Sequence, residues 1–246
     1  MKVRNCVALV TGANGGLGRV WVSRLTALGA AKVYAGVRDP THSPLAGAIP
    51  VALDVTNDDS VAEAARSCPD VTLLINNAGV MRHQQFLGAA SLTDIRAEME
   101  VNFFGVLRVC RAFAPILRSS DSGGIIQMLS ASARMSYPPE ASYSASKAAA
   151  HSLTQAIRAE LAATGVRVIG VLPGTIGVGM SAGAPALSAL SPESVIDAAL
   201  AALEDAEGWE AGGDIYPGEE AQGFMVAYRQ DEAGLERALS EMAKIV

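Results

Sequence analysis

The sequence predicts an α/β fold in which a doubly wound parallel sheet of about seven strands is flanked by helices, as a single domain over residues 1–246. Short apolar segments alternate at least six times with segments whose apolar residues recur at helical spacing, and no linker interrupts this alternation. A glycine-rich turn also follows directly on the first apolar segment. A chain of 246 residues, 50% of them hydrophobic, can bury the core of one such sheet.

The first predicted strand covers residues 6–11, which are apolar enough to be buried on both faces of a sheet. The turn Gly12-Ala-Asn-Gly-Gly-Leu-Gly18 follows, and helical spacing then continues over 19–28 until Gly29. A strand, a glycine turn and a helix together aim backbone N–H groups at a pyrophosphate. The spacing G-x-x-x-G-x-G differs from G-x-G-x-x-G, so an ordinary glycine-rich loop is the alternative interpretation.

The second predicted strand, residues 31–36, ends just before Arg38, in the place where the adenosine ribose of a dinucleotide lies. An acidic residue there binds the 2′-hydroxyl, whereas an arginine pairs with a 2′-phosphate through charge-assisted hydrogen bonds. Arg38 therefore favours NADP(H) over NAD(H). The competing interpretation is a solvated arginine paired with Asp39.

The third predicted strand, residues 49–53, ends at Asp54. This carboxylate either accepts a hydrogen bond from the adenine amino group or opens the turn before a helix at 58–67, which has a capping-box-like start. The fourth strand, 71–75, is followed by Asn76-Asn77-Ala78-Gly79. Small and amide residues at a strand's carboxyl end let a ligand approach closely and supply hydrogen bonds without charge.

The next predicted helix covers 91–117 and contains Asn102 in its interior. Asparagine competes with the helical backbone for hydrogen bonds, and such local conflicts tend to fall at functional sites. A fifth strand at 124–129, a helix at 142–163 and a sixth strand at 166–172 complete the regular alternation.

Tyr143 and Lys147 are four residues apart, so on a helix they share one face, with Cβ atoms about 5–6 Å apart. A tyrosine titrates at about pH 10 in water, and a nearby ammonium stabilises the phenolate. We therefore expect Lys147 to lower the pKa of Tyr143, so that Tyr143 can exchange a proton with a substrate oxygen. We also expect Ser130 to hydrogen-bond that oxygen. By itself this spacing is weak evidence, because it occurs by chance and lysine is usually solvated.

The end of the chain is predicted less sharply. Residues of about 174–191 are small, apolar and glycine-containing, and predict a mobile loop that folds over a ligand. A helix then begins at Ser191-Pro192-Glu193, with proline at its first position. Residues 215–216 belong to a last edge strand. The segment of about 218–246 forms one or two amphipathic helices that cover the sheet or a partner subunit.

Several further side chains border the expected site. Met81, Met135, Met180 and Phe86 either line a hydrophobic substrate pocket or fill the core, which is the commoner role of methionines and aromatic residues. His83 either borders the site or is an exposed loop histidine. The three histidines of the chain are isolated, so no metal site is expected.

The composition argues against several classes of function. The formal net charge of −6, without a basic cluster, argues against a nucleic-acid partner. Cys6, Cys68 and Cys110 lack CxxC spacing, so neither a disulfide framework nor a zinc site is expected. No apolar run reaches about 18 residues, and the N-terminus lacks the hydrophobic region of a signal peptide. We therefore expect a cytoplasmic protein without a membrane partner.

Taken together, these motifs resemble the short-chain dehydrogenase/reductase family. The residues that carry the resemblance are, in order, Thr11-Gly12-x-x-x-Gly16-x-Gly18, Asp54, Asn76-Asn77-Ala78-Gly79, Asn102, Ser130, Tyr143-x-x-x-Lys147 and Pro173-Gly174. The match covers residues 5 to about 200 and is specific as a combination, although none of its pieces is. It implies a Rossmann-type fold with a nicotinamide cofactor across the carboxyl ends of the strands.

The resemblance also implies a catalytic tetrad of Asn102, Ser130, Tyr143 and Lys147. Tyr143 is then the acid in carbonyl reduction and the base in alcohol oxidation, while Ser130 polarises the substrate oxygen. Lys147 lowers the pKa of the tyrosine and holds the nicotinamide ribose, and Asn102 supports a water-linked proton path. The implied cofactor contacts are Gly12, Asn14, Gly16, Leu17, Gly18, Arg38, Asp54, Val55, Asn77, Gly79, Tyr143, Lys147, Pro173 and Ile176.

The sequence departs from the family pattern in three places. Gly15 stands where NADP-preferring members often have a basic residue, so Arg38 is alone in facing a 2′-phosphate. Val178 stands where many members have a threonine that bonds the nicotinamide carboxamide. The C-terminal segment lacks the usual glycine-rich ending. The family also implies a homodimer or homotetramer, through helices around 91–118 and 142–163.

The leading hypothesis is NADPH-dependent reduction of a ketone or aldehyde to an alcohol, reversible as alcohol oxidation, with NAD(H) as the alternative cofactor. A second hypothesis is a redox-free member of the family such as a halohydrin dehalogenase, but Gly16, Gly18 and Lys147 are retained here. A third hypothesis is a dinucleotide-sensing or scaffold protein without turnover, and only Val178 supports it.

Overall fold

The computed structural model describes the chain except for residues 43–44, 90, 179, 181–188, 206–212 and 244–246. The described residues form a seven-stranded sheet with the order β3-β2-β1-β4-β5-β6-β7, in which every pair of neighbours is parallel. The predicted doubly wound parallel sheet is therefore confirmed. Among these residues, no helix is both long and apolar enough to cross a bilayer.

The elements follow the predicted alternation, with boundaries shifted by up to three residues. The strands are β1 (Val7–Thr11), β2 (Lys32–Val37), β3 (Ile49–Ala52), β4 (Leu73–Asn76), β5 (Gly124–Met128), β6 (Arg167–Val171) and β7 (Asp214–Ile215). The α-helices are α1 (Gly16–Ala27), α2 (Asp58–Ser67), α3 (Thr93–Met99), α4 (Val106–Arg118), α5 (Ala141–Leu161), α6 (Pro192–Glu204), α7 (Glu219–Gln230) and α8 (Glu232–Ala243). Short 3-10 turns include η3 (Ala131–Ala133) and η4 (Pro138–Glu140).

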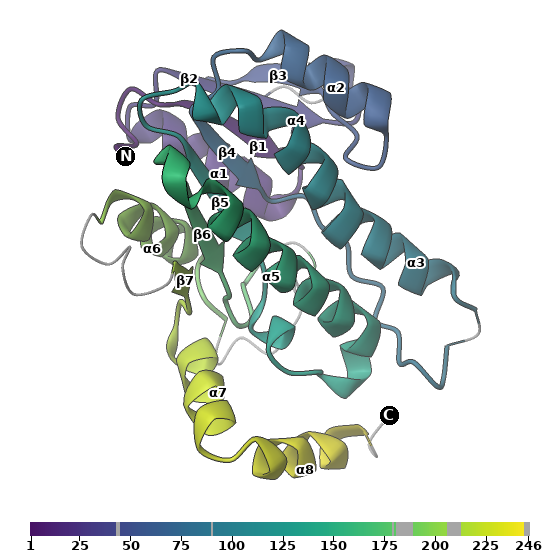
Figure 1. Cartoon of the computed structure of the whole chain (residues 1–246). Helices are drawn as coiled ribbons and strands as arrows, with labels where there is room; N and C mark the ends of the chain where they lie inside the picture. The colour runs from purple at the N-terminus through teal and green to yellow at the C-terminus, as the bar shows by residue number, and fades with distance from the viewer. Residues whose placement is uncertain (43–44, 90, 179, 181–188, 206–212, 244–246) are drawn as a thin grey trace.

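Helices cover both faces of the sheet, which explains why its strands are continuously apolar. Along β1, Ala8 and Val10 pack into a core with residues of α1 and α6, whereas Leu9 packs into a second core with residues of α2, α4 and α5. Figure 1 shows α4 and α5 side by side across one face, with α1 behind the sheet. The sheet is thus a rigid layer whose carboxyl ends all point the same way.

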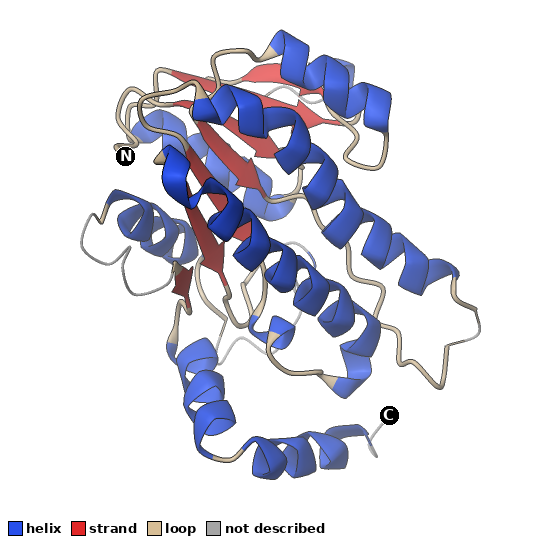
Figure 2. Cartoon of the chain, in the orientation of Figure 1, coloured by secondary structure: helices blue, strands red, loops and turns tan. Residues whose placement is uncertain are grey.

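The helix predicted over 91–117 is interrupted by a π-helical turn, η2 (Glu100–Gly105), between α3 and α4. Figure 2 shows the three segments as one long helical rod, and α3 and η2 pack against α5. The wider turn contains Asn102, so the local conflict predicted at this residue corresponds to a real change in backbone geometry.

The C-terminal segment forms two helices, α7 and α8, as one of the predicted alternatives had it. Figure 1 shows them beyond the carboxyl ends of the strands, so they cover neither face of the sheet. They contact the short turns η3 and η4 instead. The part of the prediction that placed them on the sheet is wrong, because an amphipathic pattern indicates that a helix packs but not what it packs against.

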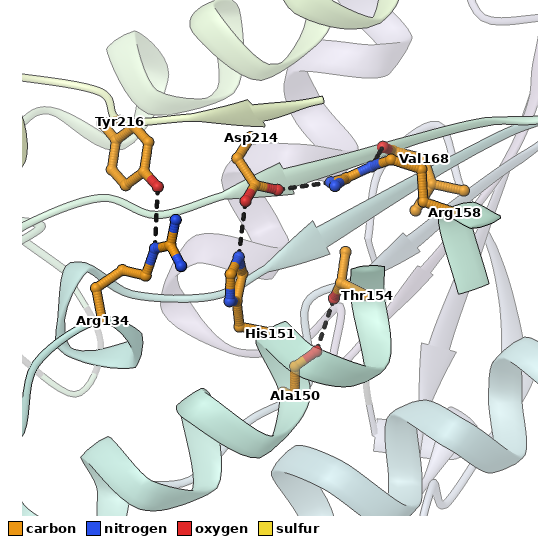
Figure 3. Close-up of polar contacts among 8 residues, drawn as sticks. All are labelled: Arg134, Ala150, His151, Thr154, Arg158, Val168, Asp214 and Tyr216. Carbon is orange, nitrogen blue, oxygen red and sulfur yellow. Dashed lines mark hydrogen bonds and ion pairs between the residues drawn. The ribbon is translucent and has the colours of Figure 1, made fainter. Parts of the chain in front are cut away.

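The edge strand β7 is tied to α5 by a buried ionic cluster, drawn in Figure 3. One carboxylate oxygen of Asp214 lies 2.7 Å from Nε2 of His151, and the other lies 2.6 Å from Nη2 of Arg158. Arg158 also donates from Nε to the carbonyl of Val168, 2.9 Å away. Burial alone would raise the pKa of the Asp214 carboxyl, but its hydrogen bonds with His151 and Arg158 hold that pKa below its ordinary value.

Candidate active site

A cavity of about 1070 Å³ lies at the carboxyl ends of the strands. It begins where strand order reverses, because β1 has β2 on one side and β4 on the other. This switch point is where open α/β sheets bind their ligands. The cavity extends from the turn before α1, past the first turns of α5, to α7 and α8.

The N-terminus of α1 opens into this cavity with its backbone N–H groups available. Among the described residues, no side chain caps α1, whose N-cap is Gly15, and its first turn contains no acidic residue. In contrast, Asn57 caps α2 and Ser191 caps α6 through side-chain oxygens. An uncapped helix N-terminus at the end of a buried strand is suited to an anionic phosphate.

The glycine turn brings α1 unusually close to β1. A Cβ atom at Gly18 would lie only 2.3 Å from the carbonyl oxygen of Gly12 and 2.8 Å from Cα of Ala13. Any larger residue at position 18 would therefore push the helix away from the strand. Close packing of the helix on the strand is one of the roles that glycine has in dinucleotide-binding turns, so it supports this interpretation over that of an ordinary glycine-rich loop.

Arg38 and Asp54 line the far end of the cavity, at the ends of β2 and β3. One oxygen of Asp54 accepts hydrogen bonds from the backbone N–H of Thr56 at 2.9 Å and from its hydroxyl at 2.7 Å. The bond from the Thr56 backbone, with a smaller contribution from the charge of Arg38, keeps the pKa of Asp54 low. Asp54 thus forms the turn before α2, which was one of its two predicted roles, while it also lines the cavity.

The turn after β4 is held against the glycine turn by Thr11 and Asn77. Thr11 Oγ1 accepts hydrogen bonds from the backbone N–H groups of Asn77 and Ala78, each at 3.0 Å. In return, Asn77 Nδ2 donates to the carbonyl of Thr11 at 3.0 Å. These reciprocal bonds fix two walls of the cavity relative to each other.

Asn102 lies one layer behind the cavity and does not line it. Its Oδ1 accepts from the backbone N–H of Val80 at 2.9 Å, and its Nδ2 donates to the carbonyl of Val80 at 2.8 Å and to Ser146 Oγ at 2.9 Å. The side chain therefore joins the turn after β4 to α5. Its implied place in a water-linked proton path stays a prediction.

Tyr143 and Lys147 both face the cavity from the first turns of α5, and they are only 8% and 5% exposed. The Lys147 ammonium donates to the carbonyl of Met128 at 2.8 Å and lies 5.6 Å from the centre of the Tyr143 ring. Ser130 also lines the cavity, and its Oγ accepts from Ser132 Oγ at 2.8 Å. The structure thus brings the predicted acid, its lysine and the serine to one wall.

The predicted effect of Lys147 on Tyr143 is wrong. Burial, followed by the negative charge of Glu140, raises the pKa of Tyr143, and a hydrogen bond with Ser130 only partly opposes this. Burial also lowers the pKa of Lys147, to about 8. The sequence spacing did not reveal that both groups are withdrawn from water, and burial is the largest cause of both shifts.

All the residues that the sequence assigned to cofactor contacts line this one cavity. They are Gly12, Asn14, Gly16, Leu17, Gly18, Arg38, Asp54, Val55, Asn77, Gly79, Tyr143, Lys147, Pro173 and Ile176. Their contacts with a cofactor stay predictions, but their convergence from six separate segments gives the site one continuous surface.

The arrangement of glycine turn, tyrosine and lysine agrees with a family model. The model of the short chain dehydrogenases matches residues 6–186. The chain belongs to this family. A short-chain dehydrogenase from Burkholderia cenocepacia, solved in complex with NADP, has a TM-score of 0.90 and 45% identity, covering 97% of this chain and 99% of that protein.

Two relatives of known sequence also resemble this short-chain dehydrogenase. An uncharacterized oxidoreductase of Staphylococcus epidermidis is 31% identical in an alignment over 218 residues, which covers 82% of this chain and 92% of that protein. A 3-oxoacyl-[acyl-carrier-protein] reductase of Synechocystis sp. is 34% identical in an alignment over 188 residues, which covers 71% of this chain and 76% of that protein.

Methionine side chains contribute to the wall of the cavity. Met81, Met135 and Met180 line the cavity, in agreement with the first of their two predicted roles. Phe86 is not among the lining residues and is 48% exposed, so both of its predicted roles, pocket and core, are wrong. The predicted loop of about 174–191 contributes Val178, whereas residues 179 and 181–188 lie outside the described part of the chain.

Two features of the substrate side were missed or left open by the sequence. His83 lines the cavity with its Nδ1 3.2 Å from the Glu140 carboxylate, although its side chain is 60% exposed, so both of its predicted descriptions apply. The helices α7 and α8 contribute Glu220, Phe224 and Leu239 to the wall. The amphipathic pattern predicted these helices, but no signal in it pointed to the cavity.

Proposed function

We propose that this short-chain dehydrogenase reduces a ketone or aldehyde to the alcohol with NADPH and also catalyses the reverse oxidation. The observation that carries the proposal is the shared cavity: the Tyr143 and Lys147 side chains face the same space as the uncapped N-terminus of α1. One cavity thus contains both a proton donor and a site suited to the phosphates of a dinucleotide. NADPH, when bound, supplies hydride to the carbonyl carbon.

The cofactor is assigned to three parts of the cavity. The N-terminus of α1 receives the pyrophosphate, Arg38 pairs with the 2′-phosphate, and Lys147 holds the nicotinamide ribose. The NADP complex of the Burkholderia cenocepacia protein, which is 45% identical, supports the choice of NADP(H). NAD(H) is the alternative cofactor.

Tyr143 donates the proton to the carbonyl oxygen, and Ser130 hydrogen-bonds the same oxygen. Because burial raises the pKa of Tyr143, its hydroxyl is fully protonated at neutral pH. Reduction needs this protonated form, whereas oxidation of an alcohol needs the phenolate. The raised pKa therefore favours the reductive direction near pH 7.

We assign an uncharged, apolar carbonyl compound as the substrate. Methionines and Phe224 line the substrate side, where the carboxylates of Glu140 and Glu220 also lie. The cationic Arg38 is at the opposite, adenosine end of the cavity. Negative charges that line the same cavity repel a carboxylate substrate more than an uncharged one.

We further propose a homodimer or homotetramer that pairs the helices around 91–118 and 142–163. Phe104, in the π-helical turn between α3 and α4, is 44% exposed, and a partner subunit at this surface would cover it. The three cysteines are free and buried, which supports a reducing, cytoplasmic location.

The test is the consumption of NADPH with a panel of apolar ketones and aldehydes, followed by identification of the alcohol product. We expect turnover with NADPH that exceeds turnover with NADH, and one molecule of alcohol for each NADPH consumed. NADPH binding detected by fluorescence, without turnover of any compound in the panel, would contradict the proposal and favour a dinucleotide-sensing protein.

A further inference from the structure

The first turn of α7 reaches the loop that follows β6. The backbone N–H of Thr175 donates to Glu220 Oε2 at 2.7 Å, and the Thr175 hydroxyl donates to Glu220 Oε1 at 3.4 Å. Thr175 comes directly after Pro173-Gly174 and lines the cavity with them. A single carboxylate thus connects two segments that are 45 residues apart in the chain.

The loop is shaped to receive this carboxylate. A Cβ atom at Gly174 would lie 2.2 Å from Glu220 Oε2 and 2.8 Å from Cδ, and the three atoms nearest to it all belong to the Glu220 side chain. Glycine at this position therefore leaves the space that Glu220 occupies. A carboxylate that accepts a backbone N–H in such a space makes a charge-assisted bond, which is about twice as strong as a neutral one.

The same helix supplies the substrate-side wall. Phe224 lies one helical turn after Glu220, and both side chains line the cavity. Leu239 of α8, which packs beside α7, adds to the wall and is buried. The position of this wall therefore depends on how α7 is held against the loop at 173–176, from which Pro173 and Ile176 face the expected nicotinamide.

We propose that Glu220 is a positioning residue that fixes the C-terminal helices to the cofactor loop and so sets the affinity for the carbonyl substrate. The inference rests on the proposed reductase function. Without the bond from Thr175, α7 is free to move relative to the loop, and Phe224 no longer stays at one distance from Tyr143. Substrate binding then weakens, while the proton donor itself is unchanged.

The test compares Glu220→Ala, Glu220→Gln and the control Glu219→Ala, which changes an exposed neighbour in the same helical turn. We expect Glu220→Ala to raise KM for the ketone about tenfold while kcat changes less than about threefold. Glu220→Gln keeps an oxygen that accepts from Thr175, so its KM stays near that of the wild type. Glu219→Ala is expected to match the wild type.

A second variant, Gly174→Ala, tests the contact even if Glu220→Ala folds poorly, and a double variant tests it where both single variants fold. Gly174→Ala displaces the Glu220 side chain, so it is expected to raise KM as Glu220→Ala does. The double variant is expected to show the KM of Glu220→Ala and no more, because the two changes break one contact. Effects that multiply in the double variant would overturn the proposal.

The other contradicting results are an unchanged KM in Glu220→Ala, or a Glu220→Gln variant as impaired as Glu220→Ala. Either one overturns the role of Glu220 while wild-type turnover leaves the reductase function in place. A wild-type protein that binds NADPH without reducing any carbonyl compound contradicts the proposed function itself, so the two failures are distinguishable.

Discussion

The Lys147 ammonium lies 5.6 Å from the centre of the Tyr143 ring and donates to the carbonyl of Met128. Both side chains are buried, and burial lowers the pKa of Lys147 to about 8 while it raises that of Tyr143. Lysine, and not tyrosine, is therefore the member of the pair that titrates near neutral pH. Several measurable consequences depend on this relationship and on the charges around it.

The pH dependence of cofactor use tests the lysine. The ratio kcat/KM for NADPH reports groups of the free protein, and it is expected to fall as the pH rises through about 8 and Lys147 loses its proton. Arginine stays charged throughout this range. The fall is therefore expected to disappear in Lys147→Arg, even at a lower overall rate. An identical fall in that variant would assign the titration to another group.

Replacement of Arg38 tests the choice between the two dinucleotides. If Arg38 pairs with the 2′-phosphate, Arg38→Ala loses charge-assisted hydrogen bonds worth about 2 kcal/mol, and KM for NADPH rises about 30-fold. The KM for NADH, which lacks this phosphate, is expected to stay within about twofold. Equal losses with both cofactors would show that Arg38 supports the fold of the site and does not read the phosphate.

A pair of substrates that differ only in charge tests the carboxylates of the cavity. The wild type is expected to reduce a keto ester at least about tenfold more efficiently than the matching keto acid, because Glu140 repels the acid. Glu140→Gln should lower this ratio of the efficiencies with ester and acid. Glu219→Gln, which changes an exposed residue, should leave the ratio unchanged. Burial raises the pKa of Glu140, although His83 opposes this, so the preference is expected to weaken at acid pH. Equal efficiency with ester and acid would contradict the assignment.

The buried cluster at β7 predicts a pH-dependent contribution to stability. The pKa of Asp214 is lowered in the folded protein, so its contribution is present above the unfolded value of about 3.9 and is lost as the pH falls through the lower, folded value. Asp214→Asn is expected to reduce the free energy of unfolding by about 3 kcal/mol at pH 7, with a smaller difference from wild type in acid.

Urea unfolding at several pH values measures this contribution, and Asp197→Asn is the control. Asp197 pairs with Arg24 at the surface, where the two side chains are 45% and 37% exposed, so its loss is expected to cost much less stability than the loss of Asp214. Equal costs for the two variants at pH 7 would mean that the cluster around Asp214 contributes no more than a surface pair.

The sheet was predictable because its central strands are buried on both faces and are therefore mostly apolar, as in residues 71–75. The π-helical turn was not, since Asn102 within it forms hydrogen bonds with Val80 and Ser146, which only the tertiary structure brings near. The pKa of Tyr143 was predicted in the wrong direction for a similar reason. Spacing gives the proximity of two groups, whereas burial decides how they titrate.

The position of the C-terminal helices could not be predicted from the sequence either. Their apolar spacing predicted helices over 219–244, and α7 and α8 confirm them. Their position depends on partners distant in the sequence, such as the loop at Thr175 that meets Glu220. Glutamate in the first turn of a helix is too common to signal such a contact.

The most direct test of the account is the rate of ketone reduction by Tyr143→Phe, measured beside NADPH binding by fluorescence titration. Phenylalanine keeps the ring and removes only the proton donor. We predict that kcat falls by a factor of about 10³ while the affinity for NADPH stays within about threefold of wild type. Reduction by Tyr143→Phe at the wild-type rate would contradict the account, because the proton would then come from another group.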